Sequence, residues 1–146
     1  MKLIHFYRFY RFLYVKKLYL FSKVVYSLSY YLFNSSVPPK VKIGRNTVFS
    51  YGGIGLVIHS DTVIGDNCVI GQGITIGGRS KHTTAPKIGN NVYLGAGCRI
   101  LGPIEIGDNV IIGPNAVVIK SIPSNCIAVG VPAVIKKENI NPTDFI

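Results

Sequence analysis

The stretch "GLVIHSDTVIGDNCVIGQGITIGG", residues 55–78, carries an aliphatic residue at every sixth position. Three of these residues are followed by glycine, but Ile58 is followed by His59. A helix repeats apolar residues every three or four positions and an exposed strand repeats them every two, so neither element explains a period of six. The stretch therefore predicts a repeat architecture and raises the question of why a histidine occupies a glycine position.

The period of six runs from residue 43 to residue 118, with irregular spacing only at 49–58 and 76–88. A chain that forms one short strand and one bend in each unit closes a three-sided coil, in which residue i lies beneath residue i+18. Glycine after the aliphatic residue lets the chain bend against the neighbouring coil without a Cβ clash. Residues 41–122 are therefore predicted to form four to five stacked coils.

The positive charge is concentrated at the N-terminal end of the chain. Nine of the 16 basic residues lie in positions 1–60 and all six acidic residues follow them, so these 60 residues carry +9 and the remaining 86 carry +1. Twelve of the 16 Phe and Tyr residues precede Asn34, and residues 2–33 contain no Gly, Pro, Asp or Glu. This composition predicts helix over roughly the first 33 residues, with a break between Lys16 and Ser22.

Several partners fit this basic, aromatic segment. Charged residues interrupt every apolar run, and no small-residue cleavage site follows, so we expect neither a membrane span nor a secretory signal. Tyr, Phe and basic residues suit the lipid headgroup layer, and the alternative is packing against the rest of the domain. Interleaved basic and aromatic residues also suit single-stranded nucleic acid, but no nucleic-acid module accompanies them, and we expect no such partner. A cytoplasmic location is expected, with peripheral contact of residues 1–33 at the inner membrane face as an option.

The three cysteines do not have the paired spacing of a metal site or a disulfide framework. In the absence of an export signal we expect reduced thiols. Cys68 and Cys98 fall at core positions of the repeat, where a small apolar thiol packs well.

Three segments, "VIGDNCVIGQGITIGG", "PKIGNNVYLGAGCRILGPIEIGDNVIIGPNAVV" and "AVGVPAVI", resemble the hexapeptide-repeat acyltransferases. The resemblance covers residues 41–137 and is closest to the serine-acetyltransferase-like branch, which includes enzymes that O-acetylate sugars of bacterial surface polysaccharides. It implies a mainly β fold, a left-handed parallel β-helix preceded by one or more helices. The expected divisions are a helical segment 1–36, a β-helix domain 37–137 and a tail 138–146.

The resemblance also implies direct acetyl transfer from acetyl-CoA to an acceptor, with a histidine as general base and without a metal. Of the three histidines, His5 belongs to the N-terminal helix, which leaves His59 and His82 as candidates. A metal enzyme of the same fold needs three histidines around one ion. With His5 in the N-terminal helix, only two histidines remain, so we expect no such metal site. The family further implies a homotrimer with each site between two subunits.

His59 is expected to lie beside the segment that carries His82. Eighteen residues beyond His59 lies Gly77, where the repeat gives way to the polar stretch "GGRSKHTTAPK". A large loop in a repeat protein is a common place for a site, so the convergence of the two irregularities favours a catalytic role for His59 over the alternative of an exposed corner residue. Asp61 is a candidate to orient the imidazole, and its alternative is a solvated turn residue.

The matching cofactor segments contain small residues at successive bends. Gly77, Ala96 and Pro114 are about 18 residues apart, so we expect them to stack along one edge. Lys136, with Lys120 or Lys137 as alternatives, can neutralise CoA phosphates. The complete set of cofactor candidates is Gly77, Gly78, Gly95, Ala96, Gly113, Pro114, Val131, Pro132, Ala133 and Lys136.

The chain departs from the serine acetyltransferase pattern at its functional residues. An aspartate and two histidines of that pattern correspond approximately to Ser36, to Tyr51 or Gly52, and to Ala85. The expectation is therefore an acceptor other than serine, namely a sugar hydroxyl in bacterial surface polysaccharide biosynthesis. The alternatives are a serine O-acetyltransferase of cysteine biosynthesis, a sugar N-acetyltransferase and a non-catalytic scaffold.

Overall fold

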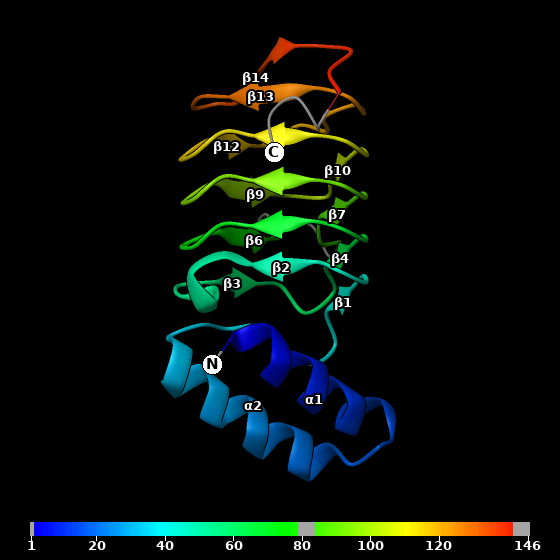
Figure 1. Ribbon diagram of the computed structural model, residues 1–146, viewed down its shortest axis with the longest axis vertical. Helices are drawn as coiled ribbons and strands as arrows, with labels where there is room; N and C mark the ends of the chain where they lie inside the picture. The colour runs from blue at the N-terminus through cyan, green and yellow to red at the C-terminus, as the bar shows by residue number, and fades with distance from the viewer. Residues whose placement is uncertain (1, 79–83, 142–146) are drawn as a thin grey trace.

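The computed structural model describes residues 2–78 and 84–141. Two helices lie across one end of a column of stacked coils (Figure 1). They are α1 (Leu3–Val15) and α2 (Tyr19–Phe33), and the turn between them falls within the predicted break. A short 3-10 helix, η1 (Ser50–Gly53), lies between the second and third strands.

The strands form three flat faces of a prism, here named A, B and C, and the chain visits them in the order B, C, A. Parallel pairing within each face confirms the predicted β-helix class, and the two helices precede the β-helix along the chain. Face A contains β3 (Val57–Ile58), β6 (Thr75–Gly77), β9 (Arg99–Leu101) and β12 (Val117–Val118). Face B contains β1 (Lys42–Ile43), β4 (Val63–Ile64), β7 (Lys87–Ile88) and β10 (Glu105–Ile106). Face C contains β2 (Val48–Phe49), β5 (Val69–Ile70), β8 (Tyr93–Leu94), β11 (Ile111–Ile112), β13 (Ile127–Val129) and the antiparallel β14 (Val134–Lys137).

The interior of the prism is built from two columns of side chains per face, as the period of six predicts. The second residue of each short strand points inward, and Ile70, Ile76 and Ile100 have no exposed surface. The fifth residue of each unit is also buried, including Cys68 and Cys98. Burial of one such aliphatic side chain contributes about 1.5–3 kcal/mol, so the stacked columns are the main source of stability.

Glycine is required at two of the three edges of the prism. At the edge between faces B and C, a Cβ on Gly65 would lie 2.5 Å from the Gly89 carbonyl oxygen. At the edge between C and A, a Cβ on Gly95 would lie 2.6 Å from the main-chain nitrogen of Pro114. At the edge between A and B, named the A/B edge below, a Cβ on Gly77 would meet nothing closer than 3.8 Å. Only at this last edge is there room for a side chain directly after the strand.

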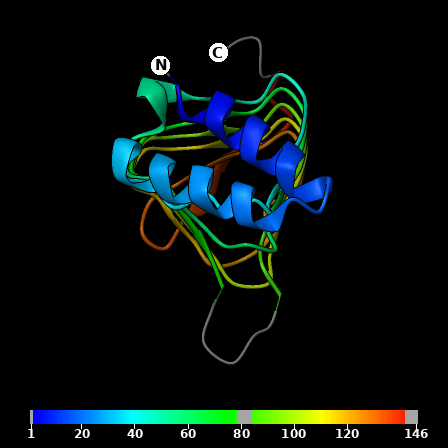
Figure 2. The ribbon, with the colours of Figure 1, turned by 90° about the horizontal axis from the view of Figure 1, so that it is seen from below.

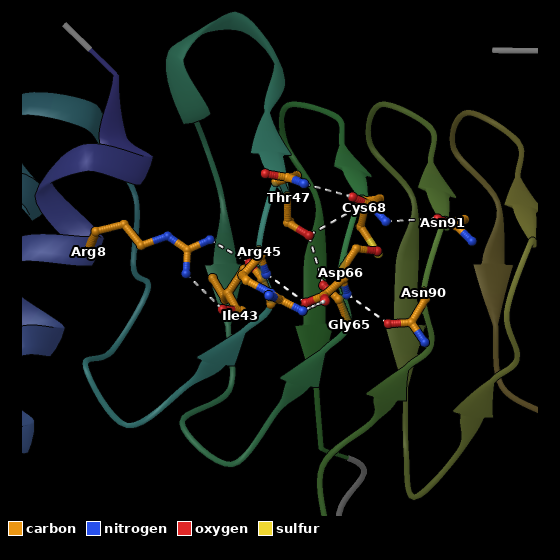
Figure 3. A network of polar contacts seen from close by, with 12 residues as sticks. Arg8, Ile43, Arg45, Thr47, Gly65, Asp66, Cys68, Asn90 and Asn91 are labelled. Carbon is orange, nitrogen blue, oxygen red and sulfur yellow. Dashed lines mark hydrogen bonds and ion pairs between the residues drawn. The ribbon is translucent and has the colours of Figure 1, made fainter.

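A ladder of asparagines runs along the edge between faces B and C. Asn67 and Asn91 have positive φ angles of 57° and 54°, which asparagine tolerates better than other side chains. The Asn67 amide donates to Asn91 Oδ1 at 3.2 Å, and the contact is repeated from Asn46 through to Asn125. Figure 3 shows Asn91 in this ladder. The ladder joins successive coils at positions where a turn is needed in any case.

Helix α1 closes one end of the prism through polar contacts with the first coil. The Tyr7 hydroxyl donates to the Val41 carbonyl at 2.7 Å and the Tyr10 hydroxyl donates to the Val37 carbonyl. Arg8 extends from α1 to the Ile43 carbonyl at 2.9 Å (Figure 3). Burial raises the pKa of both Tyr7 and Tyr10.

Neither of the two described helices combines the length and the apolar character needed to cross a bilayer.

Candidate functional site

His59 lies at the A/B edge, directly after β3. Its main-chain nitrogen donates to the Ile76 carbonyl at 2.8 Å, and the pairing of Ile58 with Ile76 places His59 next to Gly77. The expected approach of His59 to the start of the interrupted segment is therefore confirmed. The imidazole is exposed. His82 falls outside the described residues.

Asp61 contacts His59 through its main chain and not through its carboxylate, which was the expected partner of the imidazole. The main-chain N–H of Asp61 donates to Nδ1 of His59 at 3.3 Å, whereas its carboxylate pairs with Lys40 at 2.5 Å. The hydrogen bond with Lys40 lowers the pKa of Asp61, and the same bond raises the pKa of Lys40. A neutral imidazole that accepts a hydrogen bond at Nδ1 carries its proton on Nε2.

The A/B edge carries a column of residues that end or directly follow the four strands of face A. The strand register stacks His59, Gly77, Leu101 and Ile119 on one another. Three of these four residues have side chains, and a Cβ on the fourth, Gly77, would meet nothing closer than 3.8 Å. His59 is thus not an isolated exception to the glycine rule, and the question raised by the sequence has a steric answer.

The expected stacking of Gly77 with Ala96 and Pro114 is wrong. Gly77 pairs with Leu101, 24 residues later, because the interrupted segment inserts six residues before the next coil. Gly95 and Ala96 instead follow β8, and Gly113 and Pro114 follow β11, on the edge between faces C and A. The cofactor candidates therefore divide between two edges, with face A between them.

A cavity of about 320 Å³ lies at the end of the A/B edge remote from the helices. Lys120, Pro132 and Ala133 are among its lining residues. Ala133 is held there because its main-chain nitrogen donates to the Val117 carbonyl at 2.8 Å. Of the remaining candidates, Val131 and Lys136 are exposed, and Lys136 belongs to β14.

The vertical distance between His59 and this cavity is set by the stacking of strands. Ile119, which lines the cavity, lies three coils above His59 in the same column. Strands stack about 4.8 Å apart, so the separation is about 14 Å. An extended ligand can therefore connect the cavity with the imidazole along one open edge.

The three positions that correspond to functional residues of the serine acetyltransferase pattern lie outside this column. Ser36 pairs with Val57 beneath face A, and its hydroxyl is 3.0 Å from the Tyr26 hydroxyl. Tyr51 lies in η1 and is exposed, whereas Ala85 is buried. None of these side chains is an acid or a base at neutral pH.

Lys40, Leu101 and Ile119 were missed as residues of this edge by reasoning from the sequence. The sequence does contain a signal for the open edge. In every third unit of the repeat, the aliphatic residue is followed by His59, Gly77, Leu101 or Ile119, whereas in the other units it is nearly always followed by glycine. Assigning each unit to a face before counting would have revealed the open edge. Lys40 precedes the first unit and has no such signal.

Within residues 2–78 and 84–141, no group of three His, Cys, Asp or Glu side chains is placed to hold a metal ion. Cys68, Cys98 and Cys126 are buried free thiols, and burial raises the pKa of Cys98 to about 12.

Comparison with known proteins identifies the class to which this prism belongs. Residues 85–120 match the family described as bacterial transferase hexapeptide (six repeats), and residues 55–80 match the hexapeptide repeat of succinyl-transferase. The chain belongs to the hexapeptide-repeat acyltransferases.

Its relatives place it on the serine-acetyltransferase-like branch. It is 38% identical to the serine acetyltransferase of Synechococcus elongatus over 82% of this chain and 50% of that protein, and 39% identical to the enzyme of Staphylococcus aureus over 87% and 60%. The structure of serine acetyltransferase from Brucella abortus in complex with coenzyme A superposes with a TM-score of 0.87 at 34% identity, over 92% of this chain and 54% of that one. The chain thus spans between half and two thirds of the length of these relatives.

These relatives contradict the expected sugar acceptor in polysaccharide biosynthesis, because they are named serine acetyltransferases. The expectation rested on the basic helices and on the missing pattern residues.

Proposed function

We propose that this chain is an acetyl-CoA-dependent O-acetyltransferase with L-serine as its acceptor. The observation that carries the proposal is its 38–39% identity, over 82–87% of its length, to proteins named serine acetyltransferase. A related structure in complex with coenzyme A, with a TM-score of 0.87, supports the same donor.

The chemistry requires a base, because a serine hydroxyl is a weak nucleophile at neutral pH. Among the described residues the prism offers one imidazole, that of His59, and general-base catalysis contributes about 10²–10⁴-fold in rate. The serine oxygen attacks the thioester carbon and the C–S bond breaks. The proton taken by the imidazole passes to the departing thiolate, so the step is balanced without another reactant.

The hydrogen bond at His59 defines which nitrogen can act as the base. Nδ1 accepts the Asp61 N–H at 3.3 Å, which is a long hydrogen bond, and in a neutral imidazole this contact corresponds to a proton on Nε2. An incoming serine hydroxyl replaces this amide as the donor to Nδ1. Before the acceptor binds, the Asp61 main chain holds the imidazole, while the Asp61 carboxylate remains paired with Lys40.

The donor is proposed to lie along the A/B edge. The cavity beside Pro132 and Ala133 accommodates the far end of the cofactor, with Lys120 and Lys136 near its phosphates, and the acyl end extends toward Gly77, Gly78 and His59. A homotrimer with sites between subunits remains part of the proposal, since a neighbouring prism packed beside the open A/B edge would complete a groove there. The proposed location is the cytoplasm, where acetyl-CoA and serine are both available.

The direct test is release of free CoA thiol from acetyl-CoA in the presence of L-serine. We expect serine-dependent release by the wild-type chain, and a loss of about 10²–10⁴-fold in His59→Ala. The protein's own thiols do not interfere, since all three cysteines are buried. Product analysis by mass spectrometry should detect O-acetylserine.

The matched variant is His82→Ala, which separates the two histidines named from the sequence. Retained activity in His82→Ala together with loss in His59→Ala supports the proposed base. Loss in His82→Ala alone would transfer the role to His82, and the absence of any serine-dependent release would overturn the proposed acceptor.

A further inference from the structure

Helix α2 has the inverse of the usual surface pattern of a helix on a globular protein. Its buried residues are Ser22, Ser29 and Phe33. An apolar stripe faces away from the prism, with exposures between 52% and 82%, and consists of Leu20, Phe21, Val24, Leu28 and Tyr31.

The helical period explains this arrangement. At 100° per residue the five members of the apolar stripe fall within an arc of about 100°, and Ser22 and Ser29 fall on the opposite side. The Ser22 hydroxyl donates to the Tyr10 carbonyl at 2.7 Å, so small polar residues bring α2 against α1. The large apolar side chains are thereby left outside.

Helix α1 extends the same surface. Phe9, Phe12 and Val15 are 55%, 56% and 63% exposed. Figures 1 and 2 show that both helices lie across the end of the prism, so that their outer surface faces away from the coils. Many exposed large apolar side chains on one pair of helices mark an interaction site.

The charges beside the apolar stripe select the partner. Lys16 and Lys17 lie in the turn between the helices and Lys23 lies on α2, and all three are exposed. The first 60 residues of the sequence contain no Asp or Glu. A second copy of the chain would bring these lysines close to one another without an acid to pair them. An anionic lipid surface offers negative headgroups for the lysines and an acyl boundary for the Phe, Leu and Tyr side chains.

We propose that the α1–α2 hairpin is a peripheral docking surface for an anionic membrane, with α2 lying in the interface and the prism projecting from it. The proposal is independent of the acetyltransferase activity, because the A/B edge does not contribute to this surface.

The test is co-sedimentation of the full chain with phosphatidylcholine vesicles, with and without phosphatidylglycerol. We expect binding only to the vesicles that contain phosphatidylglycerol, weakened by added salt. Each lysine near an anionic surface contributes about 5-fold in affinity, so Lys16→Gln, Lys17→Gln and Lys23→Gln together should lower the partition by about 100-fold.

A second variant tests the apolar part of the surface. Phe21→Gln with Leu28→Gln removes two exposed side chains, each worth about 10-fold in partition. The matched control is Val48→Gln with Ile54→Gln, at positions that are 47% and 56% exposed outside the two helices, and it should bind as the wild type does. Circular dichroism and light scattering accompany each variant.

Equal binding to neutral and anionic vesicles, or unchanged binding of both hairpin variants, would overturn the proposal. A change in oligomeric state in the hairpin variants without loss of lipid binding would assign the surface to self-association instead.

Discussion

At the scale of single residues, the fifth position of each repeat unit shows how a hydroxyl can be tolerated in the core. Thr47 Oγ1 donates to the Gly65 carbonyl at 2.8 Å and accepts the Cys68 N–H at 3.0 Å. Thr62 is the fifth residue of another unit and precedes a strand of face B, and its buried hydroxyl has no hydrogen-bond partner in the part of the chain that the structure describes. The two threonines are therefore alike in sequence position and opposite in energetic contribution.

Replacement of each threonine by valine separates these contributions. Thr62→Val removes an unsatisfied hydroxyl and should raise the free energy of unfolding by about 1 kcal/mol. Thr47→Val should lower it by about 1–3 kcal/mol, since it leaves the buried Cys68 N–H without its acceptor. Urea denaturation of both variants measures the difference. A loss of stability in Thr62→Val equal to that in Thr47→Val would mean that Thr62 has a partner.

His59 shows how far reasoning from the sequence could go at this scale. Its place beside Gly77 could be predicted from a count of 18, since no insertion separates β3 from β6. Its pairing with the main chain of Asp61 could not, because Lys40 competes for the Asp61 carboxylate and lies outside the repeat.

At the scale of elements, the three edges of the prism differ in how closely their coils approach. The period of six predicts the bends but treats all of them as equivalent. The strand register of each face distinguishes the edges. This register depends on the insertions in the repeat, and counting every sixth residue does not show at which edge an insertion lies. This is why the strands were predicted correctly and the alignment of Gly77 with Ala96 was not.

Alanine at Gly95 and at Gly77 should have opposite consequences. Gly95→Ala places a Cβ 2.6 Å from the backbone of the next coil and should destabilise the fold by about 1–3 kcal/mol. Gly77→Ala has open space and should leave stability unchanged or raise it by about 0.4–1 kcal/mol, because it reduces the freedom of the unfolded chain. Thermal unfolding followed by circular dichroism compares the two, and equal destabilisation would contradict the open A/B edge.

Docking of α1 on the first coil predicts a dependence of stability on alkaline pH. Burial raises the pKa of Tyr7 and Tyr10 above the ordinary value of 10.0, so above that pH the unfolded chain loses protons that the folded chain retains. The stabilisation is complete below pH 10.0 and is lost as the pH rises above it, by up to about 1.4 kcal/mol per pH unit for each group.

Urea unfolding at about pH 9 and about pH 11 tests this dependence against the variant Tyr7→Phe with Tyr10→Phe. The variant should be less stable at the lower pH, because it lacks two hydrogen bonds, but it should lose less stability on raising the pH. Equal losses in the two proteins would show that these hydroxyls do not titrate differently in the folded state.

At the scale of the whole molecule, the helices and the A/B edge are two separate surfaces on one rigid column. The composition of residues 1–33 predicts the helices and their break, but it does not predict which side of α2 faces the prism. That orientation follows from Ser22 and Ser29, whose small size permits close packing against α1. The resulting exposure of apolar side chains is a property of the assembled molecule.

The central claim is that acetyl transfer takes place along the A/B edge, with His59 as the base. A crystal structure of the full chain with acetyl-CoA measures this most directly. The account predicts that the cofactor follows the column His59, Gly77, Leu101 and Ile119, with its far end beside Pro132 and its thioester within reach of the His59 imidazole. A cofactor bound along Gly95 and Gly113, on the other side of face A, would contradict it.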